Sequence, residues 1–485
     1  MYDKVDDDLL YDDAEEDDEL PELDPDMHAD PEHRWDIATM TVKEMLATWK
    51  GEVVKAAMEE EIRSLVGMGT WELVNRLRGV NIMKNRWVLT TKYRLDDTVE
   101  REKARLVVKG FTQVCGADYD ETYSLVSSYV TLRIFLSIIN VFDLNLMQLD
   151  MKNAFLQSKL NRVLYMYQPD YFDDGTGWVC KLLKSLYGLK QSPLLWYRAL
   201  DGVLLGAGWK KSQVDEALYF KASDNGVTCW VLVYVDDLLA ASSSPAMLKE
   251  LKQLLEDAFE LREISPVVKY LGLEIVHDRP ERKLWLHQQG YADKLRRRFI
   301  DEEQGGRVPK TPVSVDAYTE MTFDDEEVQE REEEEYRQKV GSLQFAATTT
   351  RPDIVFACSK LGSSLTYVAA TNAGKEGCRL RFLLAEFKLL DAGNPTILRV
   401  DNKSAITVAA GLGLTGNLKH MERRYAWLQH MVRRGKLVLK YIPTTEQPAD
   451  FLTKALHFPA FNRCSVAIGQ VRLGDVGDGD DDVLQ

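Results

Sequence analysis

The sequence predicts an α+β protein whose central feature is an acidic turn between two buried strands. Residues 229–241 are almost all apolar or β-branched, apart from Asp236 and Asp237, which is typical of a strand, a tight turn and a second strand. A second apolar segment, residues 146–150, also ends on an aspartate, Asp150. Segments with helical periodicity occur before and after these strands, so helices and strands are both expected.

Length and charge indicate several domains and a nucleic-acid partner. A chain of 485 residues is too long for one hydrophobic core, so two to four domains are expected. Most of the net charge of −16 lies in residues 1–34, which hold 16 Asp/Glu against Lys4 and Arg34 and are predicted to be a disordered acidic tail. Residues 76–109 instead contain 10 Lys/Arg against 4 Asp/Glu, a basic patch of the kind that binds nucleic acid.

Cysteine usage and hydropathy bear on the cellular compartment. The 6 cysteines are far apart in the sequence and include no C-x-x-C pair, which argues against a zinc knuckle or a disulfide scaffold. No apolar run approaches the roughly 18 residues of a membrane helix, and the acidic N-terminus lacks the basic start and apolar stretch of a signal peptide. We therefore expect a protein of the cytoplasm or nucleus that is not secreted and has no membrane partner.

The elements of the first half follow from periodicity and turn residues. A helical pattern ends before Gly67 and Gly69, and two strand-like segments separated by a polar turn predict a β-hairpin with cationic side chains. In chain order, we expect an amphipathic helix over 41–68, strands over 71–74, 86–94 and 102–109, a short apolar helix over 131–139 and the strand over 146–150.

The second half alternates helices with short strands. A turn at Gly188 precedes a long helix through Trp196 and Leu204 that Gly206 and Gly208 stop. After the acidic hairpin we expect helices over 245–259, 291–299, 341–365, 371–390, 404–410 and 419–434, a loop over most of 303–335, and strands over 270–275, 395–401 and 438–442.

Asp150, Asp236 and Asp237 are the candidate catalytic residues. Burying two adjacent carboxylates among apolar strands is costly unless a cation neutralises them. Two strands that each deliver an aspartate to one sheet edge suit two divalent cations, roughly 3.5–4 Å apart, which clamp the attacking and leaving oxygens of nucleotidyl transfer. An isolated Asp-Asp pair is usually a solvated turn, but the apolar flanks and the upstream strand favour a metal site here.

These segments, taken together, resemble the polymerase part of copia-type LTR retrotransposon polyproteins, over about residues 42–462. The supporting stretches are residues 71–74, 103–113, 118–126, 149–156, 186–193 (Leu-Tyr-Gly-Leu-Lys-Gln-Ser-Pro), 234–237 (Tyr-Val-Asp-Asp) and 270–274. The resemblance implies a right-hand polymerase fold of fingers, palm and thumb. It also implies a reverse transcriptase that copies an RNA or DNA template from a primer with dNTPs, inside a virus-like particle if the element is active.

The resemblance also assigns roles to individual residues. Asp150, Asp236 and Asp237 would hold two Mg²⁺ ions, with Mn²⁺ as an alternative, and Asp237 would be the supporting carboxylate. The substrate-binding residues would be Lys103 and Arg105 on the triphosphate, Phe155 under the sugar, where it excludes a ribose 2′-hydroxyl, and Tyr187, Gly188 and Lys190 at the nascent base pair. Lys109 and Arg296 to Arg298 are weaker candidates for phosphate contacts, because such side chains often line a solvated face.

By the same resemblance the chain divides into six segments. These are the acidic tail over 1–34, a helical lead-in over 35–75, fingers and palm over 76–275, thumb and connection over 276–365, a truncated RNase H-like α/β remnant over 366–457, and a tail over 458–485 that is acidic at its end.

The C-terminal remnant lacks much of an RNase H site. Asp401 and Asp450 match two of the four carboxylates that the domain needs, whereas Ser364 stands at the position of the helix-borne glutamate. Three strands with their turns need roughly 30 residues, and residues 361–366 leave almost no room for them. We therefore expect RNase H activity to be lost and the shortened sheet to be locally unstable.

Glu376 or Glu386 could in principle replace a lost carboxylate, although each lies a turn or more too far along its helix. Hybrid binding through Lys419, Arg423 and Arg424 would persist without cleavage. The alternative to an active polymerase is a catalytically inactive or domesticated nucleic-acid-binding relic. A third interpretation, an acidic interaction protein, depends on residues 1–34 alone. The sequence does not specify the oligomeric state.

Overall fold

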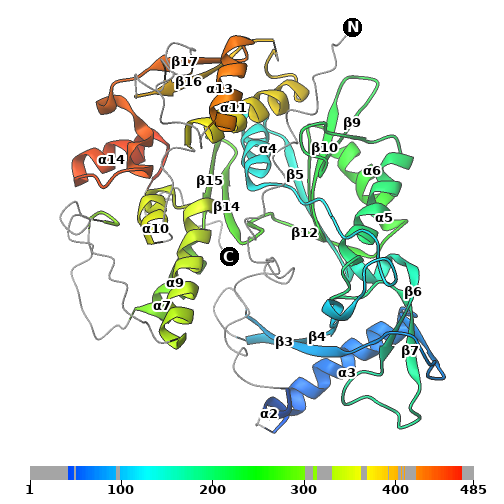
Figure 1. Cartoon of the computed structure of the whole chain (residues 1–485). Helices are drawn as coiled ribbons and strands as arrows, with labels where there is room; N and C mark the ends of the chain where they lie inside the picture. Colours follow the sequence, from blue (N-terminus) through cyan, green and yellow to red (C-terminus); the bar gives the residue numbers. More distant parts are fainter. Residues whose placement is uncertain are drawn as a thin grey trace. The chain divides into compact units, whose positions relative to one another are not determined.

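The protein is a mixed α and β structure, as predicted (Figure 1). The computed structural model describes residues 42–47, 51–93, 99–300, 310–313, 330–361, 369–391, 393–401, 406, 409 and 422–471. The predicted acidic tail, Lys419 and most of the predicted helix over 404–410 lie outside these residues. The chain forms two compact units, residues 1–110 with 164–181, and residues 111–163 with 182–485.

In the first unit a helix packs against a β-hairpin. The hairpin consists of β3 (Asn85–Tyr93) and β4 (Val99–Val108), which pair antiparallel as predicted. The helical segment before it is two helices, α2 (Val42–Leu46) and α3 (Gly51–Gly67), where the sequence predicted one. The backbone N–H of Leu106 in β4 donates to Oε1 of Glu61 in α3 at 3.4 Å, so α3 is bonded directly to the hairpin.

A second sheet completes this unit. Its strand order is β1 (Trp71–Val74), β7 (Val179–Lys184), β6 (Lys159–Tyr167) and β2 (Ile82–Met83), and β6 and β7 continue into the second unit. Two side chains of β3 bond the hairpin to the end of β6 and to the loop after it. Asn85 Nδ2 donates to the carbonyl of Tyr167, the last residue of β6, at 2.9 Å, and Trp87 Nε1 donates to the Asp170 carbonyl at 3.0 Å. Of these four strands the sequence predicted only β1.

The second unit is built on a six-stranded sheet, here called the central sheet. Its strand order is β12 (Leu261–Ile264), β5 (Asn145–Met151), β11 (Asp237–Ser242), β10 (Thr228–Tyr234), β9 (Leu218–Ala222) and β8 (Lys210–Lys211). All of its neighbouring strands pair antiparallel. The two apolar strands predicted around Asp236 and Asp237 are β10 and β11, and the predicted Asp150 strand is β5.

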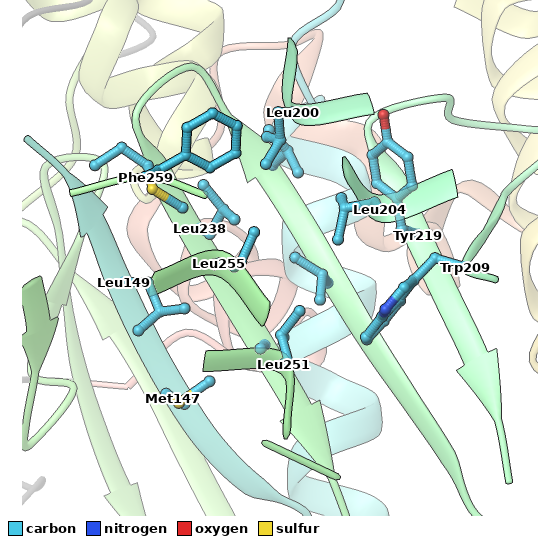
Figure 2. Packing of buried hydrophobic residues seen from close by; sticks show 14 of the residues in the cluster. Met147, Leu149, Leu200, Leu204, Trp209, Tyr219, Leu238, Leu251, Leu255 and Phe259 are labelled. Carbon is cyan, nitrogen blue, oxygen red and sulfur yellow. The ribbon is translucent and has the colours of Figure 1, made fainter. Parts of the chain in front are cut away.

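Apolar side chains cover both faces of the central sheet. Leu149, Val231 and Leu238 belong to the core on the face that α5 (Ser192–Gly206) and α6 (Pro245–Glu256) cover, whereas Leu232 and Leu239 belong to the core on the other face. Figure 2 shows the first core, with Leu149 and Leu238 of the strands against Leu251 and Leu255 of α6. Because strand side chains alternate between faces, this two-sided burial explains the continuous apolar run in the sequence.

The second face of the central sheet is covered by α4 (Tyr129–Phe142) and by a small three-stranded sheet, with α4 and α5 on opposite sides in Figure 1. The small sheet contains β13 (Lys269–Tyr270), β14 (Leu273–Asp278) and β15 (Lys283–His287). The prediction of one strand over 270–275 is wrong, because Leu271 and Gly272 have φ values of 50° and 74° and form a turn between β13 and β14.

Helices follow the small sheet. They are α7 (Gln289–Phe299), α9 (Glu330–Thr349), the 3₁₀ turn η5 (Pro352–Ile354) and α10 (Val355–Leu361). The predicted single helix over 341–365 is broken at Arg351 because the residue before a proline is disfavoured in helical conformation. The guanidinium of Arg133 in α4 donates to the Thr348 carbonyl at 2.7 Å and so caps the C-terminus of α9.

The C-terminal region packs helices on a two-stranded parallel sheet. The sheet pairs β16 (Thr396–Val400) with β17 (Leu437–Tyr441), and the helices are α11 (Ala369–Glu386) and α13 (Glu422–Arg433). Cys378, Ala409, Leu428 and Leu437 form its own small core. After the 3₁₀ turn η7 (Pro448–Leu452), the predicted tail from residue 458 begins with a further helix, α14 (Phe458–Ala467).

Candidate active site

The turn between β10 and β11 has a strained backbone. Tyr234 pairs with Asp237, so Val235 and Asp236 form a two-residue turn, and Val235 has a φ of 54°. A positive φ suits the first position of such a hairpin turn but is unusual for a β-branched residue. The buried indole of Trp196 in α5 donates from Nε1 to the Val235 carbonyl at 2.6 Å. Helix α5 therefore holds the turn in place through a hydrogen bond that no sequence pattern indicates.

Strand β5 brings Asp150 opposite Asp237. The two residues are direct partners in the antiparallel pairing of β5 with β11, and the Met151 N–H donates to the Asp236 carbonyl at 2.8 Å. Side chains of directly paired residues project from the same face of a sheet. The predicted association of Asp150 with the Asp236–Asp237 turn is thus present in the backbone pairing, and all three carboxylates are half-buried.

The chemistry of the three carboxylates fits a divalent cation, because Mg²⁺ prefers carboxylate oxygens. Their arrangement is not a closed ligand group: within the described part of the chain, no three Asp, Glu, His or Cys side chains converge to hold a metal ion. Arg262 of β12 instead contacts Asp150, with Nη2 at 3.1 Å from Oδ2.

Two buried tyrosines lie at the turn, Tyr270 and Tyr234. The hydroxyl of Tyr270 donates to the Asp237 carbonyl at 3.2 Å. Burial, reinforced by the neighbouring Asp237, raises the pKa of Tyr270 well above its usual value, and burial also raises the pKa of Tyr234. Both phenols therefore stay protonated at physiological pH, so the bond from Tyr270 to the Asp237 backbone is kept.

Phe155 and Tyr187 lie together. Phe155 is in the 3₁₀ turn η4 (Ala154–Gln157) directly after β5, and its ring meets the ring of Tyr187 edge-on with centroids 5.3 Å apart. The loop that holds Tyr187 is closed by a bond from Ser192 Oγ to the Leu186 carbonyl at 2.6 Å. Gly188 has a φ of 85°, a conformation that favours glycine. The structure thus brings together two of the residues predicted to border the substrate.

Lys190 is held at the start of α5. Its N–H donates to Gln113 Oε1 at 2.8 Å, and its ammonium donates to the Tyr119 hydroxyl at 3.2 Å and lies 5.0 Å from the centre of that ring. Gln113 in turn donates to Gln191 at 2.9 Å. These contacts fix the backbone after Gly188 and leave the Lys190 side chain exposed.

Lys103 and Arg105 belong to the first unit. They occupy alternate positions of β4, opposite Thr90 and Val88, and therefore project from one face of the hairpin. Burial raises the pKa of Glu61 in α3, and the charges of Lys103 and Arg105 partly offset this effect. The carboxylates belong to the second unit, so a shared site for these cations and Asp150 stays a prediction. Phosphate binding by Arg296, Arg297 and Arg298 also stays a prediction; these residues lie exposed at the end of α7.

In the C-terminal region, Asp401 and Asp450 share one lysine. Nζ of Lys454 lies 2.9 Å from Asp450 Oδ1 and 3.4 Å from Asp401 Oδ2, and these contacts raise the pKa of Lys454. Glu386 and Glu376, the two glutamates that could have replaced a lost carboxylate, contact other residues. Glu386 accepts from the Gln213 N–H at 2.7 Å, and Glu376 lies 4.0 Å from Arg379.

Comparison with known proteins identifies the family. Residues 68–309 match the family model described as "Reverse transcriptase (RNA-dependent DNA polymerase)". The chain is 30% identical to the Retrovirus-related Pol polyprotein from transposon TNT 1-94 of Nicotiana tabacum, over 88% of this chain and 39% of that protein. It is 29% identical to the corresponding polyprotein from transposon RE1 of Arabidopsis thaliana, over 87% of this chain and 34% of that protein.

A third relative is a putative transposon Ty5-1 protein of Saccharomyces cerevisiae, 30% identical over 48% of this chain and 75% of that protein. The chain belongs to the copia-type retrotransposon reverse transcriptase family. As a family member it spans between a third and two fifths of the length of the plant polyproteins that it matches. The region that matches the family model includes Asp150, Asp236 and Asp237, whereas Asp401 and Asp450 lie beyond it. Among its described helices, none has the length and apolar character needed to cross a membrane.

Proposed function

We propose that this chain is an RNA-directed DNA polymerase that extends a DNA primer on an RNA or DNA template. The observation that carries the proposal is the direct pairing of Asp150 with Asp237 beside the turn that holds Asp236. Three carboxylates at the ends of neighbouring strands, in a chain of this family, are the arrangement that two-metal nucleotidyl transfer uses.

The chain's own residues would position the reactants. Asp150, Asp236 and Asp237 would hold two Mg²⁺ ions, which when bound supply activation of the primer 3′-hydroxyl and neutralise the triphosphate. The hydrogen bond from Trp196 to the Val235 carbonyl fixes the position of the turn relative to α5, and the hydrogen bond from Tyr270 fixes the backbone of Asp237. These two bonds keep the carboxylates of the turn from moving independently of the sheet.

Selection of the sugar would fall to Phe155. Its ring is supported edge-on by Tyr187, which limits how far it can turn away from a ribose 2′-hydroxyl. Lys103 and Arg105 would bind the triphosphate through charge-assisted hydrogen bonds. The exposed arginines of α7 would bind backbone phosphates of the primer–template.

The test is primer extension on poly(rA)/oligo(dT) with the purified full chain and Mg²⁺. Asp236→Asn removes a charged ligand and should lower the rate by about 100-fold or more. Asp224→Asn is the matched control, because Asp224 is exposed in the turn between β9 and β10, at the end of β10 that is farther from Asp236. Equal activity of the wild type and Asp236→Asn would refute the assignment. Binding of primer–template without any extension would instead support an inactive nucleic-acid-binding relic.

We also propose that the C-terminal region does not cleave the RNA of a hybrid. The ammonium of Lys454 lies between the two matched carboxylates, and Glu386 is bonded to the segment before β9. A gel assay on a labelled RNA–DNA hybrid with Mg²⁺ or Mn²⁺ should show binding without cleavage. Cleavage that Asp401→Asn abolishes would contradict the proposal, and Glu376→Gln would then test the first substitute.

A further inference from the structure

Arg262 completes a row of charges across the catalytic end of the central sheet. It is the direct partner of Asp150 in the pairing of β12 with β5, just as Asp237 is the partner of Asp150 on the other side. The three side chains therefore project from one face, in the order Asp237, Asp150, Arg262. The ion pair between Arg262 Nη2 and Asp150 Oδ2, at 3.1 Å, follows from this register.

The backbone of β12 is tightly held where it carries Arg262. The Glu260 carbonyl accepts from the Lys152 N–H at 3.0 Å, and the Glu260 N–H donates to Gln157 Oε1 at 2.7 Å. On the opposite face of β12, Glu263 forms an ion pair with Lys252 of α6 at 2.7 Å. The strand cannot shift easily, so the position of the Arg262 Cα beside Asp150 is fixed.

The head group of Arg262 is, in contrast, accessible. Its side chain is 63% exposed, whereas that of Asp150 is 28% exposed. A long exposed side chain on a fixed backbone can leave its partner by rotation about its own bonds. A guanidinium within hydrogen-bond distance of Oδ2 occupies one side of an oxygen that a divalent cation would also need.

We propose that Arg262 is an internal counterion that competes with the divalent cation for Asp150. In the metal-free protein it neutralises part of the repulsion among three neighbouring carboxylates, and cation binding displaces it. The inference rests on the proposed function, because it assumes that Asp150 is a metal ligand.

The test is a Mn²⁺ titration of the full chain, with free Mn²⁺ measured by electron paramagnetic resonance and Mg²⁺ used as a competitor. Exposed ion pairs shift an equilibrium by only about 1.5- to 5-fold. Arg262→Gln should therefore bind Mn²⁺ about 2- to 5-fold more tightly than the wild type. Lys252→Gln also removes one positive charge beside β12 but does not contact Asp150, so its Mn²⁺ affinity should stay within about 1.5-fold.

Asp150→Asn separates the two ways in which the account can fail. If Asp150→Asn weakens Mn²⁺ binding but Arg262→Gln leaves it unchanged or weaker, Arg262 is not a competitor and this inference is overturned alone. If Asp150→Asn binds Mn²⁺ as the wild type does, both the inference and the proposed metal site are overturned. Equal tightening by Arg262→Gln and Lys252→Gln would show only a general effect of charge and would also overturn the inference.

Discussion

Helix α11 of the C-terminal region contributes side chains to the core of the central sheet, and its removal should destabilise that sheet. Leu383 and Phe387 are buried in the same core as Leu232 and Leu239, and the ring of Phe387 lies 5.4 Å from that of Trp230. We therefore predict that the C-terminal region supports the polymerase fold, whether or not it has kept an activity of its own.

The perturbation is Leu383→Ala. Leu383 is 2% exposed, and truncating a buried leucine costs about 2–5 kcal/mol. With an m-value of about 3 kcal/mol per M of urea for a unit of this size, the unfolding midpoint of the central sheet should fall by about 1 M. Leu428→Ala is the matched control, because Leu428 is 4% exposed and belongs to the separate small core of the C-terminal region.

Two cysteines report separately on the central sheet and on the small C-terminal core. Cys229 lies in β10, on the face of the central sheet that α5 and α6 cover, and burial raises the pKa of its thiol to about 12. Cys378 lies in the small C-terminal core. Both react with an alkylating reagent at about pH 8 only after local unfolding, because the thiolate is the reactive form. Pulsed alkylation in rising urea, read by peptide mass spectrometry, gives one midpoint for each.

Leu383→Ala should lower the Cys229 midpoint, and Leu428→Ala should lower that of Cys378 and leave Cys229 unchanged. If Leu383→Ala leaves the Cys229 midpoint where the wild type has it, α11 does not stabilise the central sheet and the reasoning is refuted.

Three further variants test local features of the site. Phe155→Val should lower the ratio of kcat/KM for dNTP over rNTP, because it opens the space under the sugar. Phe111→Val, at a phenylalanine that is 76% exposed, should not change this ratio. An unchanged ratio in a folded Phe155→Val protein would show that Phe155 does not exclude the ribose 2′-hydroxyl. Trp196→Phe removes the donor to the Val235 carbonyl. It should therefore lower the free energy of unfolding by about 1–3 kcal/mol and slow primer extension. Extension at the wild-type rate would show that the turn does not depend on this bond. Burial raises the pKa of Glu61, so the contribution of its protonated form to stability is present below the unfolded pKa of about 4.3 and is lost as pH rises through the folded pKa. Glu61→Gln should therefore stabilise the protein more at pH 7 than at pH 4, as measured by urea unfolding. Greater stabilisation at pH 4 would contradict a raised pKa.

The sequence was sufficient to find the strands at the centre of the fold. β10, β11 and β5 are buried on both faces, so their apolar runs are long and unmistakable, and the acidic turn between two of them stands out. The strands that were missed are short or lie at sheet edges. β12, for example, has only four residues and carries Arg262 and Glu263, so no periodicity distinguishes it from a loop.

The contacts that complete the site depend on register, which the sequence does not reveal. Arg262 is 112 residues from Asp150, and only the pairing of β12 with β5 places the two side by side. The turn after β13 was missed for a related reason, since Leu271 adopts a positive φ that its residue type does not suggest. Phe155 and Tyr187 were found because motifs of the family indicated them, while their mutual contact required the structure.

The central claim is that β5 and the β10–β11 turn form one polymerase site, and the most direct measurement is the single-turnover rate of dTTP incorporation by Asp150→Asn. The carboxamide keeps the size of the side chain and removes its charge, so primer–template affinity should stay within about 3-fold while the rate falls by about 100-fold or more. Incorporation at the wild-type rate by a folded Asp150→Asn protein would contradict the claim, because a carboxylate that holds a metal ion cannot be replaced by an amide without loss.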